Sequence, residues 1–143
     1  YALGNNEYYH GVDEVLNLLK EYTNMKILLN QNLDVGFINI AGLGDLAGLS
    51  KGLYAPDLAR VKVDLNTSKA SILLAHQPKT ALLYNLSDFD LILSGHTHGG
   101  QIFPFMFLVK LHQGFIRGLY DLGENTKLFV SSGAGFWGPS LRV

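Results

Sequence analysis

The stretch LILSGHTHGGQ at residues 91–101 constrains the fold of this chain more than any other. The apolar run Leu91–Leu93 ends at a Ser-Gly pair, and two histidines, His96 and His98, follow before two glycines. A buried strand that ends at a glycine-rich turn places its next residues at the C-terminal edge of a sheet, where open α/β folds keep their sites. We therefore expect the two histidines to be functional rather than hydrogen-bonded polar filler.

Two other short apolar runs are each followed by a ligand-type side chain. The first three residues precede Asn5, and Ile72–Ala75 precede His76. If the three runs are strands of one sheet with a common direction, Asn5, His76, His96 and His98 converge on one edge. Three imidazoles and an amide oxygen are suitable ligands for a divalent metal. Taken singly, Asn5 also fits a turn residue, and His76 also fits a cap before a helix.

Composition limits the other possibilities. The chain has 143 residues, close to one domain, and it is 48% hydrophobic. With 11 basic and 12 acidic side chains the net charge is −1, which disfavours bulk nucleic-acid binding. Because there is no cysteine, a metal here takes N and O ligands, as Mn, Fe, Zn, Ni or Mg do. No apolar run reaches the ~18 residues of a membrane helix.

The order of patterns predicts one mixed α/β domain over residues 1–143. Helical spacing of apolar residues predicts a helix over 13–22. Further helices are expected at 56–60 and 79–86, and strands at 25–30, 34–41, 71–75, 89–93, 114–121 and 127–132, with a turn at 123–125 joining the last two.

The segment Phe103–Val109 is strongly apolar and directly follows the histidine motif. It fits either a core strand or an exposed lip that meets a lipid substrate or a membrane surface. Among the remaining polar residues, His10 and Asp45 are candidates for substrate contact. A solvated helix entry is the favoured explanation for His10, and a plain turn explains Asp45 equally well. His112 is interpreted as structural.

Three motifs, taken in order, resemble those of a known family. The sequences GNNE at residues 4–7, AHQP at 75–78 and GHTHGGQ at 95–101 look like the later motifs of the calcineurin-like metallophosphoesterases, in particular their bacterial membrane-associated branch. The tail, with SGAG at 132–135, Pro139 and Arg142, is similar as well. The resemblance implies a four-layer α/β/β/α sandwich with two divalent metals at the sheet edge.

The resemblance also implies roles for individual residues. Asn5, His76 and His96 match the ligands of one metal, and His98 matches a ligand of the other. The bridging aspartate and the remaining ligands belong to motifs that come before GNH in the family, and residue 1 follows them. We therefore expect this chain to be the C-terminal portion of such a domain, without its N-terminal strands, and to hold metal weakly or not at all by itself.

Asn6 departs from the family pattern. The family has a histidine at this position, which is thought to act near the transferring phosphoryl group as a leaving-group acid or oxyanion stabiliser. Asn6 can donate a neutral hydrogen bond but cannot deliver a proton. Loss of general-acid help costs ~10²–10⁴-fold in rate. Lys79 and Arg142 are further candidates for phosphate contact.

Three hypotheses of function follow. The first is a phosphodiesterase or pyrophosphatase that uses metal-activated water on a small or lipid-linked phosphoester, in the cytoplasm or at the inner face of the bacterial membrane. The second is an inactive domain that keeps the fold and binds a metal or a partner. The third is a lipid-binding module. An exposed sheet edge also predicts a homodimer.

Overall fold

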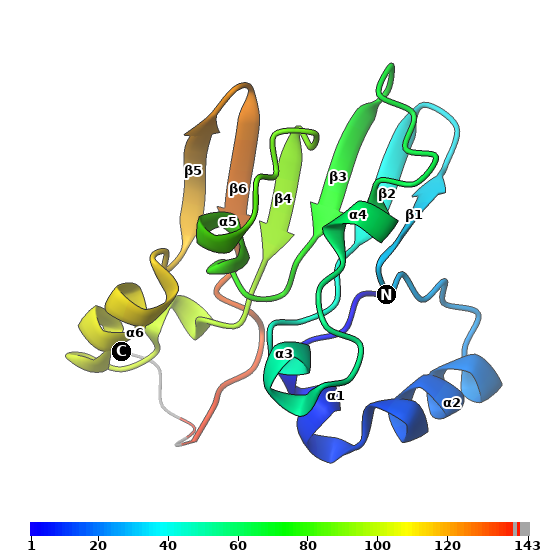
Figure 1. Cartoon of the computed structure of the whole chain (residues 1–143). Helices are drawn as coiled ribbons and strands as arrows, with labels where there is room; N and C mark the ends of the chain where they lie inside the picture. The colour runs from blue at the N-terminus through cyan, green and yellow to red at the C-terminus, as the bar shows by residue number, and fades with distance from the viewer. Residues whose placement is uncertain (139, 141–143) are drawn as a thin grey trace.

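A six-stranded sheet with the strand order β1-β2-β3-β4-β6-β5 organises the computed structural model, which describes residues 1–138 and 140 (Figure 1). The strands are β1 (Gln31–Asp34), β2 (Ile38–Gly42), β3 (Ala70–Leu74), β4 (Leu91–Ser94), β5 (Gly118–Gly123) and β6 (Thr126–Val130). The strands β2, β3, β4 and β6 are mutually parallel, and the outer strands β1 and β5 run antiparallel to their neighbours. The carboxyl ends of the four parallel strands therefore meet at one edge, the lower one in Figure 1.

The helices gather mainly below that edge and in front of the sheet (Figure 1). They are α1 (Asn5–His10), α2 (Val12–Tyr22), α3 (Ala47–Lys51), α4 (Leu58–Val61), α5 (Thr80–Leu83), the short 3-10 helix η1 (His98–Gly100) and α6 (Phe105–Gln113). The first three helices share a small core in which Leu3, Tyr8, Val12 and Leu16 are buried. This core holds the start of α1 against the rest of the molecule, which fixes the position of Asn5.

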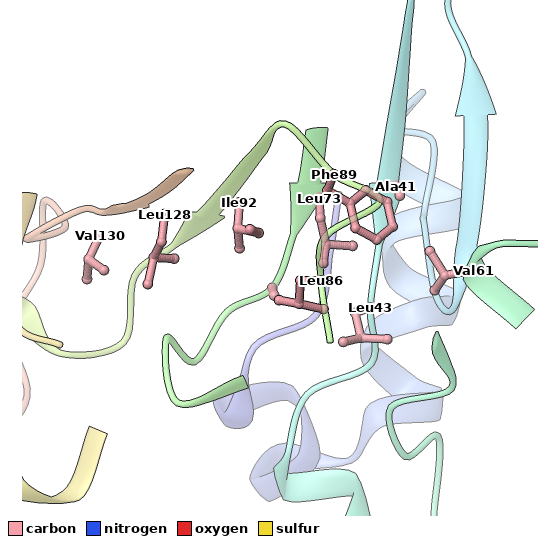
Figure 2. Packing of buried hydrophobic residues seen from close by; sticks show 10 residues of the cluster. Ala41, Leu43, Val61, Leu73, Leu86, Phe89, Ile92, Leu128 and Val130 are labelled. Carbon is pink, nitrogen blue, oxygen red and sulfur yellow. The ribbon is translucent and has the colours of Figure 1, made fainter. Parts of the chain in front are cut away.

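The main core lies on one face of the sheet. Its members are the inward side chains of alternate strand residues and the side chains that close over them, namely Ala41, Leu43, Val61, Leu73, Ala75, Leu86, Phe89, Ile92, Leu128 and Val130 (Figure 2). Alternation puts every second residue of a strand on the same face. Each large apolar side chain buried there contributes about 1.5–3 kcal/mol to folding. The core fixes the strands whose ends carry the histidines.

The opposite face of the sheet is apolar too, but it is more open. Across it, Leu74 pairs with Leu93, Leu93 with Phe129, and Phe129 with Leu119. Phe129 and Leu119, at one end of this row, are 43% and 62% exposed. We call this the second sheet face. Strands that are apolar on both sides are typical of a sheet that is covered on both faces.

Most of the expected elements are present, and the α/β class is confirmed. The helix over 13–22 is α2, the strands over 71–75 and 89–93 are β3 and β4, and the last two strands form the antiparallel pair β5 and β6. The helices expected at 56–60 and 79–86 are the shorter α4 and α5.

Four expectations about elements were wrong. Residues 1–3 are not a strand, so the run before Asn5 is not part of the sheet. Residues 25–30 are not a strand: the Leu28 amide donates to the Tyr1 carbonyl, so this segment and the first residues hold each other. The single strand expected over 34–41 is two strands, β1 and β2, joined by a turn in which the Gly36 amide donates to Asp34. The segment Phe103–Val109 is part of helix α6 and the turn before it, and not a core strand.

Among the described residues, no helix combines the length and the hydropathy needed to cross a bilayer. The predicted phosphate contact at Arg142, like the similarity at Pro139, lies outside the described residues.

Candidate metal centre

Three of the predicted ligands meet at the carboxyl edge of the sheet. His76 follows β3, His96 follows β4, and Asn5 is the first residue of α1. The side-chain oxygen Oδ1 of Asn5 lies 2.9 Å from Nε2 of His76 and 3.0 Å from Nδ1 of His96. The two imidazole rings face each other edge to face, with 5.2 Å between their centroids. Segments far apart in the sequence therefore direct one oxygen and two ring nitrogens at one point.

This donor set fits a divalent cation. Two ligand atoms each ~2.1 Å from an ion and at right angles are separated by about 3.0 Å, close to the separations that Asn5 makes with the two rings. Within residues 1–138 and 140, histidine, aspartate and glutamate side chains alone do not form a group of three that could hold a metal. The amide oxygen of Asn5 is therefore needed as the third donor.

The electrostatics of the two rings suit ligands. Burial lowers the pKa of His76, although the charge of Glu7 acts in the opposite direction. Burial, together with the neighbouring His76 ring, lowers the pKa of His96 to about 4. Both imidazoles are therefore neutral near pH 7, and only a neutral imidazole has a lone pair to give to a metal.

His98 lies at the same cavity but apart from this group. Its Nδ1 is 3.2 Å from the carbonyl oxygen of Gly135, which accepts a hydrogen bond when that nitrogen carries a proton. The structure therefore brings together Asn5, His76 and His96, and it places His98 alongside them. This arrangement parallels the expected division of the ligands between two ions.

The loop that carries the two histidines has an unusual backbone. His96 and His98 have φ angles of 66° and 49°, in the left-handed region that costs a non-glycine residue about 1–3 kcal/mol. Between them, the hydroxyl of the buried Thr97 donates to the carbonyl of Ile116 and holds the loop in place. Such strain is kept where the surrounding structure fixes it, and it clusters at functional sites.

Gly4 completes the support of the histidine rings. A Cβ atom at Gly4 would lie 3.0 Å from three carbon atoms of the His76 ring. The backbone amide of Gly4 donates to Oε2 of Glu7, at 2.7 Å, so the chain is held against the ring. The glycine of the GNNE motif is explained by this close approach.

A cavity of about 430 Å³ opens beside the three donors. Its polar lining includes Asn5, Asn6, His76, His96 and His98, and its apolar lining includes Phe105, Leu108 and Val109 of α6 with Trp137. Thr97, His112 and Gln113 complete the lining. A ligand in this cavity would contact both the candidate metal ligands and hydrocarbon.

The remaining predicted residues are distributed differently. Asn6 lines the cavity, as its predicted catalytic role requires. His10 is exposed at the last residue of α1 and is not part of the cavity lining. Asp45 is only 2% exposed and also lies outside the lining, so its position does not support substrate contact in this cavity.

Asp45 belongs instead to a buried chain of polar side chains below the site. Its Oδ1 accepts from the Gln77 side chain at 2.8 Å and from the Ala47 amide at 2.8 Å, and burial raises its pKa. Gln77 in turn accepts from Gln113 of α6 at 3.2 Å. Because Gln77 follows His76 in the sequence, these hydrogen bonds join Gln113 in the cavity wall to the loop that carries the candidate ligand His76.

Sequence reasoning missed part of the cavity lining. His112 was interpreted as structural, yet it lines the cavity, as do Gln113 and Trp137. Trp137 is held by Gln101, whose amide nitrogen donates to the Trp137 carbonyl at 2.7 Å and whose oxygen accepts from the Trp137 amide at 2.9 Å. The only sequence feature that indicated these contacts was Gln101, the last residue of the GHTHGGQ motif.

Comparison with known proteins gives the family. The chain is 85% identical, over all 143 residues, to an uncharacterized metallophosphoesterase of Campylobacter jejuni, and 47% identical over 99% of its length to one of Helicobacter pylori. It is 34% identical, over its whole length, to a transmembrane protein with metallophosphoesterase domain of Danio rerio. No family model matches the chain, and no solved structure matches it significantly.

The chain spans 38% of the length of the two bacterial relatives and 35% of the zebrafish one. All three relatives carry the same family name, and in each case nearly the whole of this chain is matched. The matched region includes the residues that meet at the carboxyl edge of the sheet. The chain belongs to the metallophosphoesterase family.

Proposed function

We propose that the intact protein is a metal-dependent phosphoesterase that hydrolyses a phosphodiester or pyrophosphate bond. The observation that carries the proposal is the convergence of Asn5 Oδ1 with the ring nitrogens of His76 and His96 at the side of a cavity. These three residues would hold one divalent ion, and His98 would contribute to a second.

Divalent ions such as Mn, Fe, Zn or Ni would polarise a phosphoryl oxygen in this site and lower the pKa of a water molecule. The protein itself contributes metal ligands that carry no charge. Neutral imidazoles and an amide leave the charge of a cation uncancelled, which favours binding of an anionic phosphoryl group. The lowered pKa values of His76 and His96 keep these rings in that state.

Asn6 is placed to contact the substrate. It follows the ligand Asn5 in α1, it is exposed, and it lines the cavity. Its amide can orient a phosphoryl or leaving-group oxygen by donating a hydrogen bond, but it has no proton to give. We therefore propose that the protein acts on a substrate whose leaving group needs little protonation, or that its turnover is slow.

The substrate we propose is a lipid-linked phosphoester. Phe105, Leu108 and Trp137 line the same cavity as the amide and imidazole groups. A phosphoryl group at the candidate ligands would leave an attached apolar chain against this wall. Burial of such a chain adds about 0.8 kcal/mol of binding free energy for each CH₂ group.

The competing proposal is an inactive domain that keeps the fold and binds a metal or a partner. Asn6 favours it, because this residue cannot replace the histidine that the sequence motif leads us to expect. The two proposals differ in turnover but not in metal binding.

Hydrolysis of bis-p-nitrophenyl phosphate by the intact protein, with Mn²⁺ or Zn²⁺ added, separates the two proposals. We expect turnover that a chelator abolishes, and a higher rate with Asn6→His. His96→Ala is the matched control, in which both metal binding and turnover are lost. Metal binding by calorimetry with no turnover, in both the native protein and Asn6→His, would contradict the enzyme and favour the inactive domain.

A further inference from the structure

Helix α6 has the composition of a buried helix but an exposed position. Its sequence, FMFLVKLHQ, is apolar at its first five positions and again at Leu111. A helix that is apolar all round is normally enclosed by protein or lipid. Here Leu111 is 85% exposed and Phe107 59% exposed, and Gln113 is the buried residue of the helix.

The apolar surface extends beyond the helix to both sides of the cavity. Phe103, just before α6, and Phe136 and Trp137, in the tail, are exposed large hydrophobic residues too. Trp137 lines the cavity together with residues of α6, and Gln101 holds its backbone. We call this surface the α6 patch; its members are Phe103, Phe105, Phe107, Leu108, Leu111, Phe136 and Trp137.

The segment that carries most of the α6 patch has basic residues but no acidic ones. No acidic residue occurs between Asp90 and Asp121, whereas Lys110 and Arg117 are both exposed. Arg117 reaches back to the histidine loop, because a Cβ atom at Gly99 would lie 3.5 Å from its Cδ. An apolar surface with aromatic rings and basic side chains is typical of proteins that lie at the interface of an anionic bilayer.

We propose that the α6 patch docks the protein onto an anionic phospholipid membrane, with the mouth of the cavity facing the lipid. Phe105 and Leu108 are both exposed and part of the cavity lining, so they form the rim of the cavity. A protein partner on the patch would close this rim. A membrane covers the same side chains and also supplies a ligand with apolar chains. Docking depends on the patch alone; delivery of a lipid substrate also rests on the proposed function.

Vesicle sedimentation with the intact protein tests the docking. The vesicles contain phosphatidylcholine alone or with phosphatidylglycerol, and the variant is Phe107→Gln with Leu111→Gln. Neither residue lines the cavity, so hydrolysis of bis-p-nitrophenyl phosphate serves as the check that the fold is intact. Phe37→Gln with Tyr22→Gln is the matched control, since these residues are 84% and 73% exposed and lie outside the patch.

We expect the native protein and the control to sediment with phosphatidylglycerol vesicles, and the α6 variant to bind about tenfold or more weakly. Equal binding by the α6 variant, equal binding to vesicles without phosphatidylglycerol, or no binding at all would overturn the proposal. Vesicle binding without hydrolysis would contradict only the proposed function. Hydrolysis of the soluble substrate without vesicle binding would contradict only the docking.

Discussion

Single atoms decide how closely the candidate ligands approach one another. The ring of His76 is confined between Asn5, which it contacts through Nε2, and Gly4, whose missing side chain leaves room for the ring. His96 reaches the same amide oxygen from a left-handed backbone conformation. Small changes at these positions should therefore change metal binding before they change the fold.

Gly4→Ala is expected to weaken metal binding about 10–100-fold, as substitutions beside metal ligands do. The backbone of Gly4 has φ −106° and ψ −178°, which alanine also adopts, so the effect would come from the clash of the new Cβ with the His76 ring. Gly95→Ala is the matched control, because a Cβ at Gly95 meets nothing within 4 Å. Calorimetry with Mn²⁺ or Zn²⁺ measures both; equal affinities would show that the ring has room to move.

The two buried rings also predict how stability depends on pH. An unfolded histidine has a pKa of about 6.5, whereas the folded protein lowers the pKa of His76 and brings that of His96 to about 4. Between these values the unfolded chain binds protons that the folded chain does not. The free energy of unfolding of the metal-free protein should therefore fall as the pH falls from about 6.5 to 4.

Urea unfolding at several pH values, for the native protein and His96→Gln, measures this effect. The variant should lose less stability across the window. The comparison is needed because burial raises the pKa of Asp45, which contributes with the opposite sign. An identical pH dependence in the two proteins would show that His96 does not titrate as proposed.

Among the elements, α6 is joined to the site by side chains rather than by the sheet. Gln113 at its end bonds to Gln77, and Gln77 bonds to Asp45, all within the interior. A Cβ at Gly100 would lie 2.4 Å from the Cβ of Met106, so the histidine loop and α6 also touch directly. The helix and the candidate ligands are therefore expected to move together.

Gln77→Leu is expected to lower the free energy of unfolding by about 1–3 kcal/mol, because it leaves the buried groups of Asp45 and Gln113 with fewer partners. If the chain of bonds also positions His76, metal affinity should fall as well. Gln31→Leu, at an exposed position in β1, is the control. Loss of stability with unchanged metal affinity would assign Gln77 a structural role only.

The elements also show what could be predicted from sequence. The strands at 71–75 and 89–93 were predictable because short apolar runs bounded by turn residues can be read locally, and the meeting of His76 and His96 followed from the common direction of these strands. Asn5 joins them from the start of α1, so the strand expected to place it was not the reason for its position. Helix α6 was not predictable, because its first five residues are all apolar and its polar residues gather at its end, so no helical period can be detected. The role of Asp45 depends on Gln77, 32 residues away, and no local pattern reports it.

The molecule as a whole has one sheet face that is well covered and one that is not. Figure 2 shows the covered face, where buried side chains from β2, β3, β4 and β6 form a continuous row. The second sheet face carries a similar apolar row, but Leu119 on the edge strand β5 is 62% exposed. Exposed apolar surface next to a strand edge favours association with another chain.

The 143-residue chain is accordingly expected to self-associate, as a dimer or larger, when studied by light scattering. Leu119→Lys should shift it toward the monomer, because a charge at this position opposes burial of both the edge and the second sheet face. Leu83→Lys, at a residue of α5 that is 54% exposed, is the control. A monomeric native chain would contradict the prediction.

Helix α6 contributes both to the cavity and to the proposed membrane-binding surface, and this limits how the protein can evolve. Phe105 and Leu108 of this helix line the cavity and also belong to the surface that we propose enters the lipid. A substitution that reshapes the cavity for a new substrate would thus also alter how long the protein stays on a bilayer. Substrate selectivity and residence time on the membrane would then change together at these positions, where one is hard to alter without the other.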